Sequence, residues 1–206
     1  MGVGDPLTGY PEQSCGTVLN TAPSIRELIS AEAIHDKVVS LGCTITQDYP
    51  DADAALLLVG VLKGGAMFAS DLLRQIRRPL EIDFVAFSSY GAGTETLGQV
   101  RILKDLDTSA AGKHVIIVED ILDTGLTLHL SGLVQALHER GARSVRICAL
   151  LDKPSRRRVD VSADYCGFTI GDEFVVGYGM DFAERYRNLP YVGVLEPARA
   201  AEPKLE

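Results

Sequence analysis

The chain has 206 residues, of which 46% are hydrophobic, and a formal net charge of −8 at pH 7. This length and apolar content suit one compact domain with a buried core. The negative charge argues against a dedicated nucleic-acid surface, and no stretch approaches the roughly 18 consecutive apolar residues of a membrane span. The first residues lack the basic cap and apolar stretch of a secretion signal. We therefore expect a cytoplasmic protein with neither nucleic-acid nor membrane partners.

The two ends of the chain carry little periodicity. We expect residues 1–24 to form a flexible N-terminal segment and residues 197–206 a flexible tail, with a single domain over residues 25–196 between them. The first predicted helix runs from a cap at Ser30 to Leu41, because apolar residues recur on one face of this stretch. Gly42 is predicted to end it.

Short apolar runs then alternate with turns and amphipathic patterns along the chain. Such runs occupy residues 55–62, 115–118 and 145–151, and a further strand is expected over residues 81–90. Amphipathic helices are predicted after the first two runs, and the second of these helices is expected to stop at Gly141. Strands that are apolar on both faces are buried on both faces. The pattern predicts an α/β fold with a central, mainly parallel sheet flanked by helices.

Two segments fall outside this alternation. Residues 91–98 are polar and glycine-rich, so we expect a flexible hairpin tip there. Residues from about 159 to 195 do not continue the strand-helix rhythm, and we expect them to form a small lobe over the sheet. Such a lobe could cover a site.

The segment after the predicted strand at residues 115–118 carries the strongest chemical signal. Glu119, Asp120 and Asp123 follow a buried strand directly, at the kind of sheet edge where open parallel sheets bind ligands. Clustered acids repel one another unless a cation or several hydroxyl donors compensate them. The turn over residues 123–127 can direct backbone N–H groups and hydroxyls at a phosphate. The segment therefore predicts a sugar phosphate with Mg²⁺, the alternative being a polar turn in which Asp123 or Thr127 only caps a helix.

Motifs for the two commonest phosphate-binding loops, GxxxxGK[ST] and GxGxxG, are absent from this segment. Five other motifs accompany it in chain order: Val61–Gly65, Ser88–Gly91, Arg101–Asp107, Leu150–Pro154 and Asp172–Asp181. Together they resemble the type I phosphoribosyltransferases, and over about residues 25–195 the chain is similar to hypoxanthine (hypoxanthine-guanine) phosphoribosyltransferases.

The resemblance implies a fold, an activity and an assembly. The implied fold is that of the type I phosphoribosyltransferases, with a hood lobe from the C-terminal segment and a flexible lid loop. The implied activity is purine salvage: 5-phosphoribosyl 1-pyrophosphate and hypoxanthine, with guanine as a second base, give IMP or GMP and pyrophosphate. Mg²⁺ is the implied cofactor, and self-association as a dimer or tetramer is also implied.

The resemblance assigns the ribose and phosphate contacts to the acidic segment. It makes Asp123 the group that takes the proton from N7 of the purine, where a carboxylate can also offset positive charge developing on the ribose. It places Glu119 and Asp120 at the ribose hydroxyls and a metal-bound water network. The residues that it assigns to the 5′-phosphate are Thr124, Gly125, Leu126 and Thr127, of which Leu126 can contribute only its backbone.

The resemblance also assigns the residues that bind pyrophosphate and a second metal ion. Lys63 and Gly64 match a loop in which a cis peptide is common, and glycine allows close approach of the backbone. Arg187 matches a pyrophosphate-binding arginine, whose planar guanidinium suits phosphate; from the residues alone, it is no better a candidate than Arg185. Asp181 matches an aspartate that holds a second Mg²⁺, and it could equally cap a helix at Phe182.

The purine site and the lid complete the assignment. Lys153 is placed to donate to O6 of a 6-oxopurine, and an adenine would leave that lysine without an acceptor. Phe174 would stack on the base and the Val175 backbone would read its edge, although Phe174 alone could be a core aromatic. Ser89 and Tyr90 match the lid, whose closure would exclude water.

Two other functions fit the same motifs. One is a transferase that prefers guanine or xanthine, which the surroundings of Val175 and Asp181 do not distinguish. The other is a regulator that senses phosphoribosyl pyrophosphate and binds nucleic acid. The second is disfavoured by the negative charge, by the presence of Asp123 and Lys153, and by an N-terminal segment too short for a helix-turn-helix domain.

Overall fold

A computed structural model of the chain describes residues 24–50, 54–88, 101–123, 127–154 and 162–196. These residues form one six-stranded sheet and one three-stranded sheet. The elements in chain order are β1 (Ile25–Ile29), α1 (Ala31–Asp48), β2 (Leu56–Leu62), α2 (Gly65–Gln75), β3 (Glu81–Ser88), β4 (Arg101–Lys104), β5 (His114–Leu122), α3 (Thr127–Glu139), β6 (Ser144–Asp152), β7 (Tyr165–Thr169), β8 (Val175–Val176) and β9 (Val192–Leu195).

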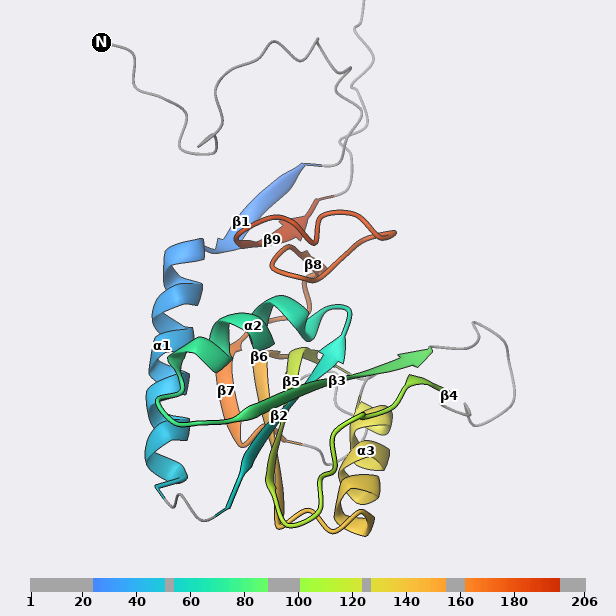
Figure 1. Cartoon of the computed structure of the whole chain (residues 1–206). Coiled ribbons are helices and arrows are strands. Elements are labelled where there is room, and N and C mark those ends of the chain that lie inside the picture. The colour runs from blue at the N-terminus through green and yellow to red at the C-terminus, as the bar shows by residue number, and fades with distance from the viewer. Residues whose placement is uncertain (1–23, 51–53, 89–100, 124–126, 155–161, 197–206) are drawn as a thin grey trace, which may run out of the picture.

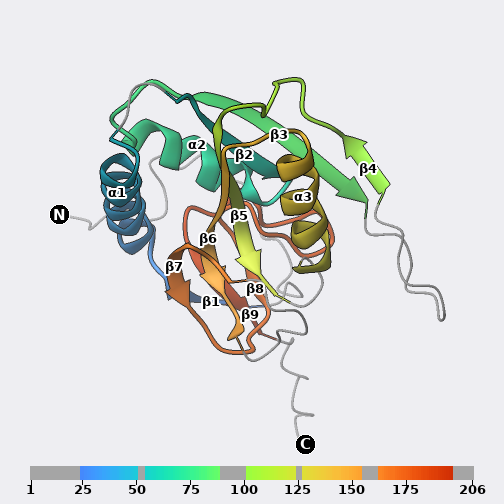
Figure 2. The ribbon, with the colours of Figure 1, turned by 90° about the horizontal axis from the view of Figure 1, so that it is seen from below.

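The larger sheet has the strand order β4-β3-β2-β5-β6-β7. Neighbouring strands are parallel except for β4, which pairs antiparallel with β3 at one edge. Helices α1 and α2 cover one face of this sheet and α3 covers the other (Figures 1 and 2). The predicted α/β fold with a mainly parallel sheet is confirmed.

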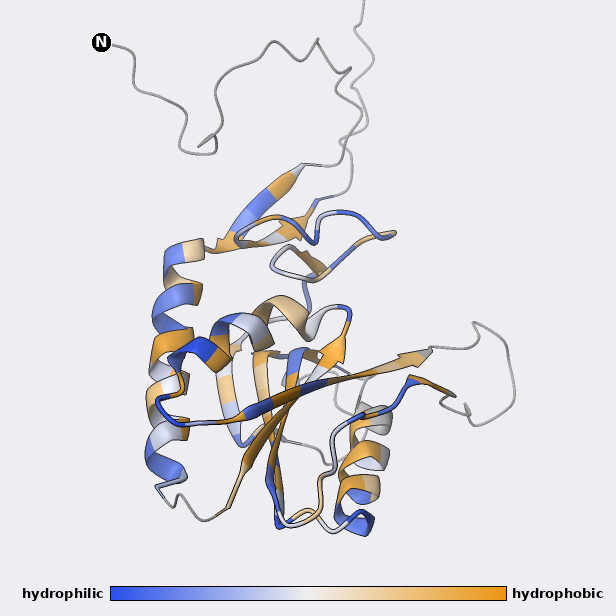
Figure 3. Ribbon diagram, in the orientation of Figure 1, coloured by the Kyte–Doolittle hydropathy of each residue, from blue (hydrophilic) through white to orange (hydrophobic). Residues whose placement is uncertain are grey.

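The core has two halves because the central strands bury both faces. Leu56 and Leu58 of β2 pack in the cluster under α1 and α2, whereas Leu57 and Val59 pack in the cluster under α3. All four side chains are 0% exposed. Figure 3 shows apolar colouring along β2 and on the helices α1 and α3 that cover the sheet.

The predicted first helix begins where expected but does not stop where expected. Ser30 is its N-cap and accepts a hydrogen bond from the Ala33 N–H at 3.2 Å. The prediction that Gly42 ends the helix is wrong, because α1 continues to Asp48. A Cβ at Gly42 would collide with Gln75 at the end of α2, so this glycine permits close packing of two helices. Gly141, by contrast, follows α3 with φ +82°, as the helix-stop prediction requires.

The C-terminal segment divides between the two sheets. Its first strand, β7, joins the larger sheet beside β6, so the expectation that residues 159–195 lie wholly outside the sheet is wrong. The rest forms a small lobe, the hood, in which β9 pairs antiparallel with both β1 and β8. In Figure 1 the hood lies over the carboxyl ends of the parallel strands.

The predicted hairpin tip, residues 91–98, and the lid residues Ser89 and Tyr90 lie outside the described residues. The antiparallel pairing of β3 with β4 on either side of them is described. No described helix is long and apolar enough to cross a membrane.

Candidate active site

A cavity of about 320 Å³ opens between the carboxyl edge of the larger sheet and the hood. Two of its walls follow β5 and β6, and the others belong to the hood. The lining residues are Asp120, Ile121, Asp123, Lys153, Asp172, Phe174, Val175, Met180 and Asp181. Residues predicted for the ribose, the purine and the metal are thereby brought together from distant parts of the chain.

The acidic group lies deeper than its sequence suggests, because β5 continues to Leu122. Glu119 and Asp120 are strand residues that are only 2% and 7% exposed, and Asp123 follows the strand. Burial, followed by the neighbouring Asp120 carboxylate, raises the pKa of Glu119 well above its ordinary value. Burial also raises the pKa of Asp120, opposed in part by a side-chain hydrogen bond with Glu119, then by the Ile121 N–H and the charge of Arg187. One oxygen of Glu119, Oε2, is buried without a hydrogen-bond partner.

The loop after β2 packs tightly against this acidic strand. Its Leu62–Lys63 peptide bond is cis. This form is common in the matching loop of the family that the sequence resembles. A Cβ on Gly64 would collide with the Asp120 carboxylate, and one on Gly65 would lie 2.8 Å from the Val118 carbonyl oxygen. Only glycine fits between this loop and β5, so both glycines are needed for this packing. The contact with pyrophosphate that the resemblance implies for Gly64 stays a prediction.

Arg187 lies beside the cavity, against Asp181 of its lining. Its Nη1 donates to the Gly179 carbonyl at 2.7 Å and its Nη2 lies 2.7 Å from Asp181 Oδ1. Asp181 does not cap a helix, because the described chain after it forms turns; its Oδ2 instead accepts the Glu184 N–H at 2.8 Å. The described contacts thus favour Arg187 over Arg185 as the cation of the site.

Lys63 reaches the hood from the opposite side. Its ammonium donates to Glu184 Oε2 at 2.8 Å, and both side chains are about two-thirds exposed, at 67% and 66%. Lys63 and Arg187 therefore lie on either side of Glu184, from which Arg187 Nη2 is 3.4 Å away.

The side chains predicted to bind a purine surround the cavity from β6 and the hood. Lys153 is 5% exposed, and its ammonium donates to the Glu173 carbonyl at 2.6 Å. Phe174 is 54% exposed and meets Phe182 edge-on at 5.6 Å, so it is not a core aromatic. Val175 lies in β8 and is only 6% exposed. A planar base would find an aromatic face and a buried cation here.

Part of the predicted phosphate turn is not described. Thr124, Gly125 and Leu126 lie outside the described residues, and Thr127 is described only as the first residue of α3. Sequence reasoning missed Gly179 and Glu184. A Cβ on Gly179, whose φ is +102°, would collide with the Gly64 carbonyl, and its pairing with Gly177 in a Gly-x-Gly run was the available signal.

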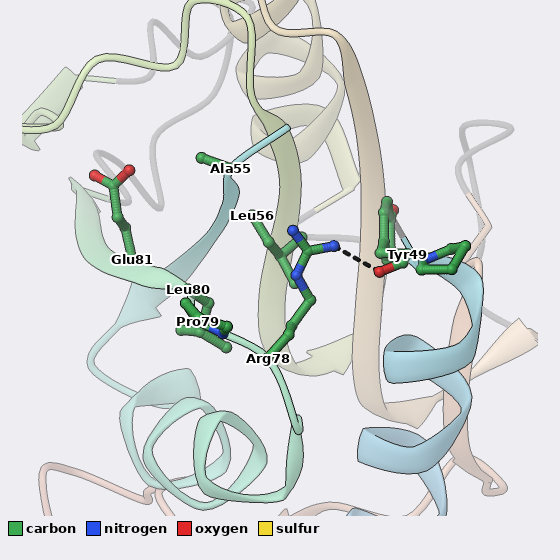
Figure 4. Close-up of a pocket in the computed structure, with 8 residues that line it drawn as sticks. Tyr49, Ala55, Leu56, Arg78, Pro79, Leu80 and Glu81 are labelled. Atoms are coloured by element: carbon green, nitrogen blue, oxygen red, sulfur yellow. Dashed lines mark hydrogen bonds between the residues drawn. The ribbon is translucent and has the colours of Figure 1, made fainter. Parts of the chain in front are cut away.

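A second, larger cavity of about 490 Å³ lies at the opposite edge of the sheet, by the first residues of β2 and β3 (Figure 4). Arg78 spans its wall and donates to the Tyr49 and Ala54 carbonyls at 2.6 and 2.8 Å. The Nε of this guanidinium is buried and has no hydrogen-bond partner among the described residues. Arg78 therefore fastens the connection between α1 and β2.

The parallel sheet, the hood and the glycine loop packed on paired acids define the fold of the phosphoribosyltransferases. Residues 28–183 match the phosphoribosyl transferase domain, and the chain belongs to that family.

Several curated relatives that the chain matches over most of their length are named hypoxanthine or hypoxanthine-guanine phosphoribosyltransferases. It is 53% identical over 171 residues to the hypoxanthine-guanine phosphoribosyltransferase of Bacillus subtilis, covering 83% of this chain and 93% of that protein. It is 50% identical over 170 residues to the hypoxanthine phosphoribosyltransferase of Salmonella typhimurium, covering 82% and 94%. A crystal structure of a hypoxanthine phosphoribosyltransferase from Staphylococcus aureus matches with a TM-score of 0.79 and 46% identity, covering 89% of this chain and 97% of that one.

Proposed function

We propose that the protein is a hypoxanthine phosphoribosyltransferase of purine salvage. It joins hypoxanthine, and guanine as a second base, to the ribose of 5-phosphoribosyl 1-pyrophosphate and releases pyrophosphate. The observation that carries this proposal is the cavity under the hood, where Asp123, Lys153 and Phe174 line one space. The names of relatives that are about half identical over most of their length support it.

In the proposed reaction, N9 of the purine forms a bond to C1′ of the ribose while the bond from C1′ to the pyrophosphate oxygen breaks. Asp123 receives the proton from N7 of the base. Its negative charge also stabilises the oxocarbenium-like ribose, chiefly in the transition state. Glu119 and Asp120 accept hydrogen bonds from the ribose hydroxyls, which relieves the repulsion between two buried carboxylates.

Base selection is assigned to Lys153. Its buried ammonium would donate to O6 of a 6-oxopurine, whereas the amino group of adenine offers no acceptor there. Phe174, which is exposed to the cavity, stacks on the ring and the Val175 backbone contacts its edge. Competitive kinetics on hypoxanthine, guanine and xanthine measures the ranking of the three bases.

Pyrophosphate and Mg²⁺ belong to the other side of the site. We assign pyrophosphate to Lys63, the Gly64 backbone and Arg187, and the 5′-phosphate to residues 124–127. No three His, Cys, Asp or Glu residues in the described ranges converge to hold a metal unaided. Mg²⁺ needs only one or two carboxylates when substrate and water supply the other oxygens.

The carboxylates present fit such an ion. Glu119 Oε2 is a buried acceptor without a hydrogen-bond partner. Burial and the neighbouring Asp120 carboxylate raise the pKa of Glu119, so a bound cation would stabilise the charged form of this pair. Asp181 would hold a second ion through lone pairs not used by Arg187 and the Glu184 N–H. Bound Mg²⁺ would neutralise charge on the leaving pyrophosphate.

We also propose that the enzyme self-associates and works in the cytoplasm. Ile102 and Leu103 on the edge strand β4 are 47% and 62% exposed, which supports self-association as a dimer or tetramer. We assign the protein to the cytoplasm, where phosphoribosyl pyrophosphate is available.

The test is turnover with Mg²⁺, phosphoribosyl pyrophosphate and each 6-oxopurine, in the wild type and in Asp123→Asn. We expect the variant to lose about 10²–10⁴-fold in kcat, the range for one general base, while still binding phosphoribosyl pyrophosphate. Asp36→Asn is the matched control, because Asp36 is exposed on α1 and should leave turnover unchanged. Unchanged turnover in Asp123→Asn would remove Asp123 from its role, and no IMP from the wild type would refute the function.

A further inference from the structure

Glu184 is placed between the two cations that the proposed function assigns to pyrophosphate. One carboxylate oxygen, Oε2, accepts from the Lys63 ammonium at 2.8 Å, and the other, Oε1, lies 3.4 Å from Nη2 of Arg187. Lys63 belongs to the loop after β2 and Arg187 to the hood, so the carboxylate bridges this loop and the hood. A diphosphate would use the same two cations.

The backbone that presents Glu184 is unusual. Phe182 and Arg185 exchange two hydrogen bonds of 3.1 Å, which closes a turn with Ala183 and Glu184 as its central residues. Both central residues have positive φ, +52° and +62°, where glycine or asparagine is the usual choice. Asp181 holds the turn by accepting the Glu184 N–H. Unfavourable backbone held at a site is a reason to ask what the side chain does there.

We propose that Glu184 is a built-in anion that pairs with Lys63 and Arg187 before substrate binds and competes with pyrophosphate for them. The proposal rests on the proposed function. Glu184 is a positioning residue: it keeps both cations at the pyrophosphate site and is displaced by the more highly charged diphosphate. Because the Glu184 side chain is 66% exposed, solvent screens both of its ion pairs, and each is weak enough to be displaced. The competition favours release of the product pyrophosphate.

The charge state of Glu184 suits this role. Lys63, through its hydrogen bond and its charge, lowers the pKa of Glu184, so the carboxylate is ionised at neutral pH. The charged groups that face it from the loop and the hood are Lys63, Arg187 and, through the turn, Asp181.

The experiment is calorimetric titration of the full-length enzyme with Mg²⁺-pyrophosphate, in the wild type, Glu184→Gln and Glu184→Ala. We expect both variants to bind pyrophosphate about two- to tenfold more tightly, the range for losing one or two exposed ion pairs. The KM for phosphoribosyl pyrophosphate should fall by a similar factor while the KM for hypoxanthine stays unchanged. A merely structural role for Glu184 would not produce this separation.

Glu81→Gln is the matched control, because the Glu81 side chain is 47% exposed, pairs with a lysine, Lys113, at 2.7 Å, and its replacement changes the net charge equally. It should bind pyrophosphate like the wild type. Equal or weaker binding by both Glu184 variants, in a wild type that makes IMP, would overturn this inference alone. A wild type that makes no IMP would overturn the proposed function.

Discussion

At the scale of single residues, the site places ionisable groups where they lower the stability of the ligand-free protein. Glu119 is 2% exposed, lies beside Asp120 and leaves one oxygen unpaired. A buried carboxylate without a cation is costly to ionise, and its raised pKa expresses that cost. Sugar hydroxyls and Mg²⁺ would supply the missing partners, so binding and stability oppose each other at this residue.

We therefore predict that Glu119→Gln stabilises the ligand-free protein and reduces its activity. A raised pKa means that the folded state holds its proton more tightly than the unfolded state, so this carboxyl costs nothing below its ordinary pKa and increasingly more as pH rises above it. The gain from glutamine should be small at pH 5 and reach about 1–3 kcal/mol at high pH. Thermal unfolding in EDTA at pH 5 and pH 8 measures it, with the exposed Glu139→Gln as control. A variant less stable than the wild type at pH 8 would contradict the argument.

At the scale of elements, one of the motifs behind the family resemblance is structural. Asp83 of β3 accepts the N–H groups of Phe84, Asp107 and Thr108 at 2.7–2.8 Å, and the Lys104 ammonium at 3.1 Å. Asp105 in the same motif pairs with Arg140 at the end of α3. The motif over residues 101–107 therefore fixes the β3-β4 hairpin and the chain beyond it.

Asp83→Asn should make stability less dependent on acid pH. Burial alone would raise the pKa of Asp83, but the backbone N–H groups and Lys104 outweigh it and lower that pKa to about 2. An acid with a lowered pKa stabilises the fold above its ordinary pKa of 3.8 and loses that contribution as pH falls towards about 2. The contribution is on the order of 2 kcal/mol. Urea unfolding between pH 7 and pH 3 should show the wild type approaching the variant, and a constant difference would contradict this.

Local sequence rules predicted the elements of the larger sheet better than they predicted the hood. The central strands and Ser30 follow from apolar runs and a capping side chain, which are local signals. Gly42 misled because tertiary packing against Gln75, and not a helix end, requires that glycine. The turn at Ala183 and Glu184 carries no glycine or asparagine, so nothing in its residues marks it as a turn.

The candidate site was predicted residue by residue only with the family resemblance. Asp123 could be chosen from the acidic segment itself, because three acids after a buried strand need compensation. Arg187 could not, since its role depends on Gly179 and Asp181 approaching it in space. The pairing of β1 with β9 joins residues from opposite ends of the chain, and no local pattern contains it.

At the scale of the whole molecule, activity requires the hood to keep its position on the larger sheet. Tyr178 in the hood donates to Asp71 Oδ2 on α2 at 2.6 Å. The adjacent Gly179 packs against the Gly64 carbonyl and accepts from Arg187. Because α2 begins directly after Gly64, this hydrogen bond holds the loop after β2 and the hood in a fixed position relative to each other.

Removing that bond should therefore affect pyrophosphate binding as well as stability. Tyr178→Phe is expected to cost about 1.5–3 kcal/mol, the range for a hydrogen bond to a charged group. The KM for phosphoribosyl pyrophosphate should rise several-fold, because Lys63 and Arg187 would no longer be held in register. Urea unfolding and steady-state kinetics measure the two effects.

Tyr165→Phe separates these effects from general destabilisation. Tyr165, at the start of β7, donates to Asp48 at the end of α1 at 2.7 Å, and its hydroxyl also accepts from Arg146 Nη1 at 2.6 Å. The variant should lose at least as much stability as Tyr178→Phe and keep the KM of the wild type. An equal rise in the KM for phosphoribosyl pyrophosphate in both variants would be the opposite outcome. That result would show that the contact between α2 and the hood has no specific role in binding, and that the site depends only on the stability of the whole fold.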